Sequence, residues 1–165
     1  MPSKEWNRLD DEVRDTLIAH QLDLPIRLST IAKAVGVAVK ASTLPAGISG
    51  EIRPSDRAGE FVIRVNRHDG SRRQRFTIAH EISHFLLHRD QIGRGISDDA
   101  LYRSSLSDSR EAEANRLAAD ILMPESLLQI ELSAARQLGV DDIVGHLAER
   151  FDVSEAAMRI RLGIG

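Results

Sequence analysis

His80, Glu81 and His84 form an HExxH motif inside the segment RQRFTIAHEISHFLLH, a set of residues able to build a metal-dependent hydrolytic site. On a helix, side chains four positions apart share one face about 6 Å apart, so both imidazoles can bind one zinc ion at about 2.0 to 2.1 Å. Glu81 then lies beside the metal-bound water. We therefore predict zinc ligation by His80 and His84 and a catalytic role for Glu81.

The motif lies in a segment with helical spacing of apolar residues. Phe76, Ala79, Ile82 and Leu86 recur every three or four positions beside the histidines, which predicts a buried helix. The alternative is an amphipathic helix whose histidines are incidental. An acidic residue such as Glu81 is hard to place on that helix without a site, because a buried charge without a partner is costly.

A catalytic zinc site needs a third protein ligand. His88 lies about 12 Å along the helix axis from His80, too far to bind the same ion, so we predict that it orients a ligand or ends the helix. Leu87 and Asp90 occupy positions where the long metzincin motif has glycine and histidine, which excludes that class. The third ligand is therefore expected to be a carboxylate further along the chain.

A second helical pattern, EAEANRLAADILMP, offers Glu111 and Glu113. Glu111 shares a face with small residues and with Asn115, which favours close helix packing, whereas Glu113 shares a face that we interpret as mostly solvated. We predict that Glu111 is the third ligand and that Asn115 hydrogen-bonds a ligating histidine and fixes its tautomer. The alternative is that both glutamates are ordinary acidic residues in the first turn of the helix, where they interact favourably with the helix dipole.

These two motifs together resemble the ImmA/IrrE-type metallopeptidases, a family of bacterial and phage regulatory proteases with a gluzincin-like site. The resemblance is specific from Arg73 to Pro124 and weaker over most of the remaining chain. It implies that His80 and His84 are the zinc histidines, Glu81 the catalytic glutamate and Glu111 the glutamate ligand. It also implies a protein substrate, often a helix-turn-helix repressor or an antitoxin.

The stretch 98–108 is polar and aperiodic, which predicts a mobile loop. It carries Tyr102, the chain's only tyrosine. A tyrosine near zinc can donate a hydrogen bond to a tetrahedral oxyanion, so we consider Tyr102 a candidate catalytic residue, with simple packing as the alternative.

The elements before the motif predict an α+β fold. Helical patterns cover residues 10–21 and 25–34, a strand follows at 37–40, and residues 51–53 and 60–66 alternate like the two strands of a hairpin. We expect a zincin-like core in which a small mixed or antiparallel sheet precedes the HExxH helix and the glutamate helix. An edge strand there could hold an extended peptide by backbone hydrogen bonds.

The C-terminal segment predicts two helices, the second capped by Ser154, in a helix-turn-helix-like pattern. We expect residues 1–125 to hold the N-terminal helices, the sheet and the peptidase core, and residues 126–165 to pack on that core. The second helix begins with Glu155, Ala156 and Ala157, a poor start for contacts to phosphates or bases, so packing or protein binding is favoured over direct DNA binding.

Composition places limits on the chemistry and the location. The 165 residues include no cysteine, which excludes disulfides and thiolate zinc ligands. The net charge of -3 gives no general attraction to nucleic acid, and Arg72, Arg73 and Arg75 are interpreted as a solvated turn or an ion-pair set. No apolar run has the length of a signal segment or membrane span, so we expect a cytoplasmic protein without membrane association.

Three functions follow from these observations. The first is an endopeptidase that holds one zinc ion and cleaves a regulatory protein. The second is a zinc-containing regulator or sensor that acts by protein binding, and the third is a DNA-binding regulator that uses the C-terminal helices.

Overall fold

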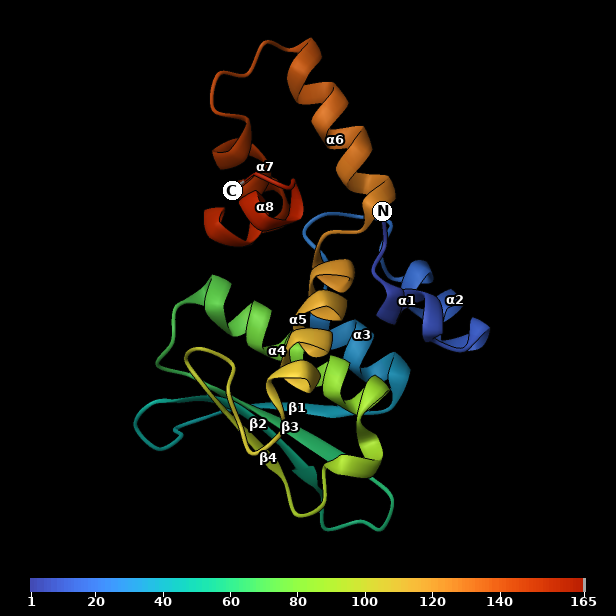
Figure 1. Cartoon of the computed structure of the whole chain (residues 1–165), viewed down its shortest axis with the longest axis vertical. Helices are drawn as coiled ribbons and strands as arrows, with labels where there is room; N and C mark the ends of the chain where they lie inside the picture. The colour runs from blue at the N-terminus through green and yellow to red at the C-terminus, as the bar shows by residue number, and fades with distance from the viewer. Residues whose placement is uncertain (165) are drawn as a thin grey trace.

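The computed structural model describes residues 1–164 and confirms the predicted α+β class (Figure 1). Within these residues, eight α-helices accompany one four-stranded sheet. The sheet lies at one end of the molecule, α4 packs on the sheet, α5 packs on α4, and α6, α7 and α8 form the opposite end. No helix in the described part has the length and apolar character needed to cross a membrane.

The sheet is mixed and has the order β1-β3-β2-β4. The predicted hairpin is confirmed, since β2 and β3 pair antiparallel, whereas β1 pairs parallel with β3. Alternation directs Ile52 and Ile63, which pair across the two strands, into the core. The strands are β1 (Ala38–Ser42), β2 (Ile48–Pro54), β3 (Phe61–Asn66) and β4 (Ile96–Asp99).

Strand β4 corrects one prediction. Asp98 and Asp99 were expected to begin a mobile loop, but they end a strand that pairs antiparallel with β2. The reason is the preceding Ile96, which is 1% exposed and anchors the strand in the core. A strand this short gives no readable alternation in the sequence.

Helix α4 (Ser71–Leu87) carries the HExxH motif and is buried along its central part, from Thr77 to Phe85. It lies close to the sheet at Gly50 of β2, where a Cβ atom would collide with the Thr77 side chain and lie 3.6 Å from Cγ of Glu81. Glycine at this position therefore allows β2 to approach the helix beside the motif.

Helix α5 (Asp108–Leu122) packs against α4 through small residues. Ala114 and Ala118 are completely buried, and Ser107 caps the helix by accepting a hydrogen bond from the Arg110 amide. The close packing brings the first turns of α5 beside the centre of α4.

The N-terminal helices are α1 (Lys4–Arg8), α2 (Asp11–Ala19) and α3 (Leu28–Val35). Helix α1 was not predicted, because five residues are too few for a periodic pattern. Helix α3 begins at Leu28 and not at residue 25, because Arg27 is extended and Ile26 is fully buried in the core.

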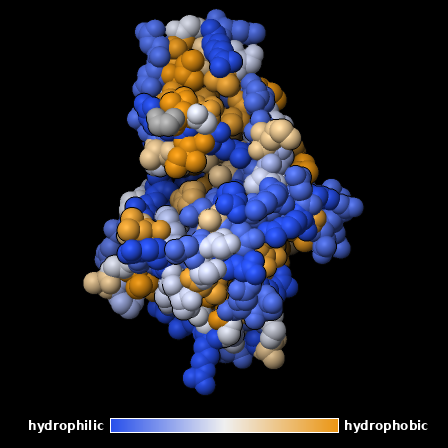
Figure 2. All heavy atoms as spheres, in the orientation of Figure 1, coloured by the Kyte–Doolittle hydropathy of each residue, from blue (hydrophilic) through white to orange (hydrophobic). Residues whose placement is uncertain are grey.

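The C-terminal helices are α6 (Glu125–Gln137), α7 (Ile143–Phe151) and α8 (Glu155–Arg161). The predicted pair is α7 and α8, with Ser154 capping α8. Arg75 of α4 donates to the Asp152 carbonyl, and Arg161 donates to the Met123 carbonyl, so α7 and α8 are tied to the core. Figure 2 shows that apolar side chains gather on the visible face over this end of the molecule.

Candidate metal centre

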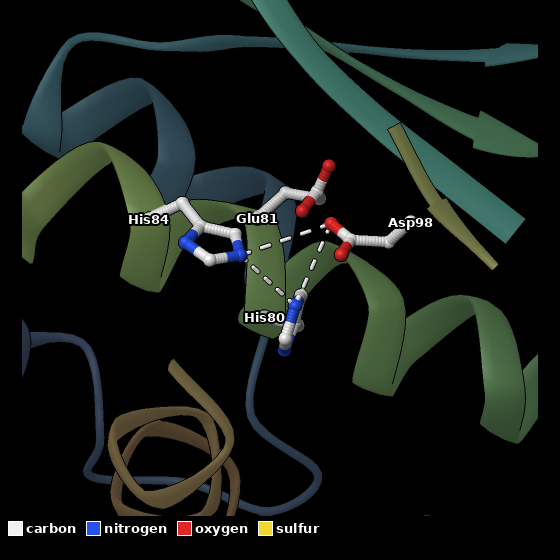
Figure 3. Close-up of side chains that lie close together, drawn as sticks. All are labelled: His80, Glu81, His84 and Asp98. Atoms are coloured by element: carbon white, nitrogen blue, oxygen red, sulfur yellow. Dashed lines mark hydrogen bonds and ion pairs between the residues drawn. The ribbon is translucent and has the colours of Figure 1, made fainter. Parts of the chain in front are cut away.

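The two histidines of the motif converge at one point on α4 (Figure 3). Both side chains are fully buried, and their Nε2 atoms are 3.1 Å apart. Tetrahedral coordination at about 2.0 Å places neighbouring ligand atoms about 3.3 Å apart. The spacing of the two nitrogens therefore suits a shared metal ion.

Glu111 reaches the same point from α5. Its Oε1 atom lies 2.8 Å from Nε2 of His84 and 3.0 Å from Nε2 of His80. Burial raises the pKa of Glu111, but the hydrogen bonds from His80 and His84 outweigh burial and lower that pKa below its usual value. The structure thus brings Glu111 together with both histidines, as the face of α5 predicted.

Asp98 is a fourth group at this point, and the sequence interpretation missed it. Its Oδ2 atom lies 3.5 Å from Nε2 of His80 and 3.8 Å from Nε2 of His84. Figure 3 shows the carboxylate directed between the two rings. The available signal was weak: Asp98 stands two residues after a buried isoleucine and so shares its face on a strand.

Two of the three carboxylates at this point lack hydrogen-bond partners. Both carboxylate oxygens of Glu81 and both of Asp98 are buried without a hydrogen bond. Burial without a partner is costly for an ionised group, so a bound cation would remove a large penalty here. His80, Glu81, His84 and Asp98 form a buried group, with ligand atoms within 4.8 Å of one another, that could hold a metal ion.

Burial also changes the pKa values of two groups at the site. The pKa of Glu81 is raised well above its usual value, mainly by burial and further by the Asp98 carboxylate. Burial lowers the pKa of His80, but the carboxylates of Asp98 and Glu111 outweigh that effect and raise the pKa to about 9. Without a metal ion, the site therefore retains protons to offset its negative charge.

A hydrogen-bonded chain fixes the orientation of the His84 ring. Glu113 can only accept when ionised, so Nε2–H of His88 donates to it at 3.1 Å. Burial is the main cause of a lowered pKa of His88, which keeps the ring neutral and leaves its Nδ1 atom as an acceptor. Nδ1–H of His84 then donates to that atom at 2.9 Å, so Nε2 is the ring nitrogen of His84 that faces Glu111 and could bind a metal ion.

Asn115 performs the same task for His80. Its Oδ1 atom lies 2.8 Å from Nδ1 of His80 and accepts the hydrogen bond from that ring nitrogen. Nε2 of His80 is thus the nitrogen directed at the site, and a metal ion would bind it by displacing the proton that it shares with Glu111. The structure thus places Asn115 and His88 in hydrogen-bond contact with His80 and His84, respectively.

The prediction that Glu113 is solvated is wrong. Its side chain is 7% exposed and lies between Arg8, Arg110 and His88. Burial raises the pKa of Glu113, but the hydrogen bonds from Arg110, Arg8 and His88 lower it to about 2. The short helix α1, which carries Arg8, was not predicted, so a second packed face on α5 was not expected from the sequence.

Tyr102 lies at the rim of the site with its ring against His80, at a centroid distance of 4.8 Å. Its hydroxyl group is 3.1 Å from Oγ1 of Thr77, and the guanidinium carbon of Arg73 lies over the ring, 5.8 Å from the ring centroid. The tyrosine therefore covers His80, with its hydroxyl group already paired.

The three arginines Arg72, Arg73 and Arg75 lie near this rim. Arg72 and Arg75 form ion pairs with Asp152, which agrees with the ion-pair interpretation.

The comparisons with known proteins identify the family. The model of the IrrE N-terminal-like domain, peptidase family M78, matches residues 32–163. The chain therefore belongs to the ImmA/IrrE family, and this membership indicates a metallopeptidase. A search of curated proteins found no match.

One solved structure is similar over almost the whole chain. It is a Mycobacterium tuberculosis transcriptional regulator, with a TM-score of 0.58 and 20% sequence identity. The match covers 98% of this chain and 49% of that chain, so this chain spans about half the length of that relative. At this identity the likeness concerns the fold.

Proposed function

We propose that this protein is a zinc endopeptidase with a zincin-like, gluzincin-type site that cleaves a regulatory protein such as a helix-turn-helix repressor or an antitoxin. The observation that carries the proposal is the convergence of His80, His84 and Glu111 beside the unpartnered carboxylate of Glu81. Family membership supports the reaction class, and the family resemblance supports the substrate class.

His80, His84 and Glu111 would hold the zinc ion, with Asn115 and His88 keeping the two rings in the required tautomers. Zinc held by these residues would supply Lewis-acid chemistry, which lowers the pKa of water from about 15.7 towards 7 and polarises a carbonyl group. Glu81 lies next to the ligands without hydrogen bonds of its own, so its carboxylate can accept a proton from water and deliver it to the leaving amine.

A cleft of about 650 Å³ adjoins the site between α4, α5 and α8. Tyr102 and Asn115 line it, and both contact His80. Phe76 and Met123 give the cleft apolar walls, and Arg73 adds a positive charge. We propose that part of the protein substrate lies in this cleft. For Tyr102 to stabilise an oxyanion, its hydroxyl group must first leave Thr77.

The test compares Glu81→Gln with His84→Ala. The wild type should hold about one zinc ion per chain, Glu81→Gln should keep it, and His84→Ala should lose most of it. Turnover of a repressor or antitoxin substrate should fall about two to four orders of magnitude in Glu81→Gln, the usual contribution of a general base.

The alternative function is a zinc-containing regulator that acts by binding. The same two variants separate the alternatives in a regulatory assay. If Glu81→Gln has no more output than metal-free His84→Ala, proteolysis is the function. Full output from Glu81→Gln together with loss in His84→Ala would reject the peptidase proposal. Salt-dependent binding to duplex DNA would instead identify a DNA reader.

A further inference from the structure

The direction of the Asp98 side chain follows from the register of the sheet. In the pairing of β2 with β4, Gly50 lies opposite Asp98 and Ile52 lies opposite Ile96. Opposed residues project on the same face, and Ile96 and Ile52 are both buried in the core. Asp98 therefore points towards α4, where the missing side chain of Gly50 leaves space beside Glu81.

The carboxylate of Asp98 is placed as a metal ligand. Its Oδ2 atom lies 3.5 Å and 3.8 Å from the Nε2 atoms of His80 and His84. The side chain is fully buried and neither oxygen has a hydrogen-bond partner. Apart from the neighbouring His80 ring, a bound cation is the partner that would stabilise a buried carboxylate in this position.

His80, His84, Glu111 and Asp98 together offer four protein ligands. Structural zinc sites have four protein ligands, whereas catalytic sites have three and keep one position open for water or substrate. We propose that Asp98 is a fourth protein ligand, which fills the open position and keeps the peptidase latent until β4 moves. The inference rests on the proposed function, because it names a regulatory state of the same site.

The same chain segment also covers the site from outside. Tyr102 lies against His80, and the Ser104 hydroxyl donates to Glu111. His80, Glu81 and His84 are completely buried, so a peptide carbonyl cannot reach them in this conformation. Movement of the segment from β4 to Ser104 would expose the metal and remove Asp98 in one step.

Strand β4 is suited to such a movement. It has four residues, lies at the edge of the sheet and pairs only with β2 among the described strands. A short edge strand with few hydrogen bonds can open locally without unfolding the core. Opening of the latent site therefore needs no change in the backbone of α4 or α5.

The test measures metal binding directly with Asp98→Asn, which keeps the side-chain size but removes the charge. Asp90→Asn is the matched control, because Asp90 is exposed near the end of α4. Zinc affinity, measured by chelator competition, should fall at least about tenfold in Asp98→Asn and stay within twofold in Asp90→Asn. Asp98→Ala gives a second variant in case the asparagine amide binds the metal.

Access to the metal provides the second measurement. In the cobalt-substituted protein, azide should leave the visible spectrum of the wild type and of Asp90→Asn unchanged, and should shift that of Asp98→Asn or Asp98→Ala. Peptide hydrolysis should rise several-fold in these Asp98 variants.

Each contrary result has a defined meaning. Azide binding by the wild type, or an unchanged zinc affinity in both Asp98 variants, would overturn the inference and leave the proposed function intact. Lost hydrolysis in an Asp98 variant with unchanged zinc affinity would also overturn it, since Asp98 would then serve the reaction without binding the metal. A wild type that binds no zinc would overturn both proposals.

Discussion

Two groups of buried carboxylates lie along α5 and differ in their partners. We call the first the metal-site cluster and the second the arginine cluster. The metal-site cluster has three carboxylates that form no ion pair with lysine or arginine among the described residues, and it comprises His80, Glu81, His84, Asp98 and Glu111. The arginine cluster pairs two carboxylates with three guanidinium groups and comprises Glu5, Glu113, Arg8, Arg110 and Arg116.

The difference shows how burial alone fails to identify function. Glu113 and Glu111 are only two residues apart on α5 and are exposed by only 6% and 4%. Glu113 is held by two arginines, whereas Glu111 faces two histidines and a serine hydroxyl group. Unbalanced negative charge around histidines indicates a missing cation, and balanced charge indicates a structural contact.

The largest expected effect is that of metal removal on the stability of the folded protein. Saturating zinc should stabilise the folded protein by about 4 kcal/mol when its concentration is a thousandfold above Kd. For a chain of this size, that corresponds to a rise in Tm of about 10 °C. Thermal unfolding with and without a chelator checks the prediction. Identical curves would mean that the metal-site cluster holds no cation.

The second effect is the pH dependence of zinc affinity. The pKa of His80 is raised from its ordinary value of 6.5 to about 9 in the metal-free protein, so zinc must displace its proton below that pH. Zinc affinity should rise about tenfold per pH unit between 6.5 and 9. The folding stability that this proton gives the metal-free protein is fully present below pH 6.5 and is lost as pH rises to 9.

Zinc titrations over this pH range, together with urea unfolding of the metal-free protein, test both slopes. Flat profiles would contradict the charge imbalance of the metal-site cluster. The zinc-loaded protein is the control, because its His80 ring is already neutral and its stability should lack this loss.

The third prediction compares one residue from each cluster in the metal-free protein at pH 7. Glu81→Gln should raise the free energy of unfolding, because burial raises the pKa of Glu81 and ionisation there is unfavourable. Glu113→Gln should lower it by about 1 to 2 kcal/mol, a value reduced by the exposure of Arg8 and Arg110 to solvent.

The pH profile separates these two effects further. The pKa of Glu113 falls from 4.5 to about 2, so its contribution is fully present above pH 4.5 and is lost as pH falls towards 2. That loss should be missing in Glu113→Gln. Changes of the same sign in the two variants, measured by urea unfolding, would show that the two clusters do not differ as described.

The smallest effect is expected from Arg110→Ala. Arg110 is 44% exposed, and its partner Glu113 keeps Arg8 at 2.7 Å after the substitution. Stability should fall by less than about 1 kcal/mol, because an exposed ion pair contributes little. Zinc affinity should stay within about twofold. A large loss of stability would show that Arg8 alone cannot hold Glu113. Arg136→Ala is a suitable control, because Arg136 is exposed on α6.

The sequence predicted the parts of the fold that depend on local pattern. The helix that carries His80 and His84, the α5 face with Glu111 and the β2–β3 hairpin all appear because apolar spacing is strong there. It missed α1, α6 as a separate helix and β4. The two shortest of these, α1 and β4, are stabilised by contacts with distant segments rather than by their own residues.

The sequence by itself determined which residues on α4 can meet at one point, because the four-residue spacing of His80 and His84 is a property of any helix. Only the tertiary structure decided what faces them. Asp98 arrives through strand pairing with β2, and Glu113 is neutralised by an arginine from a helix more than 100 residues earlier in the chain. Such contacts depend on long-range packing and leave no periodic trace, which is why the sequence predicted metal ligands on α4 but carried only a weak signal for the carboxylate opposite them.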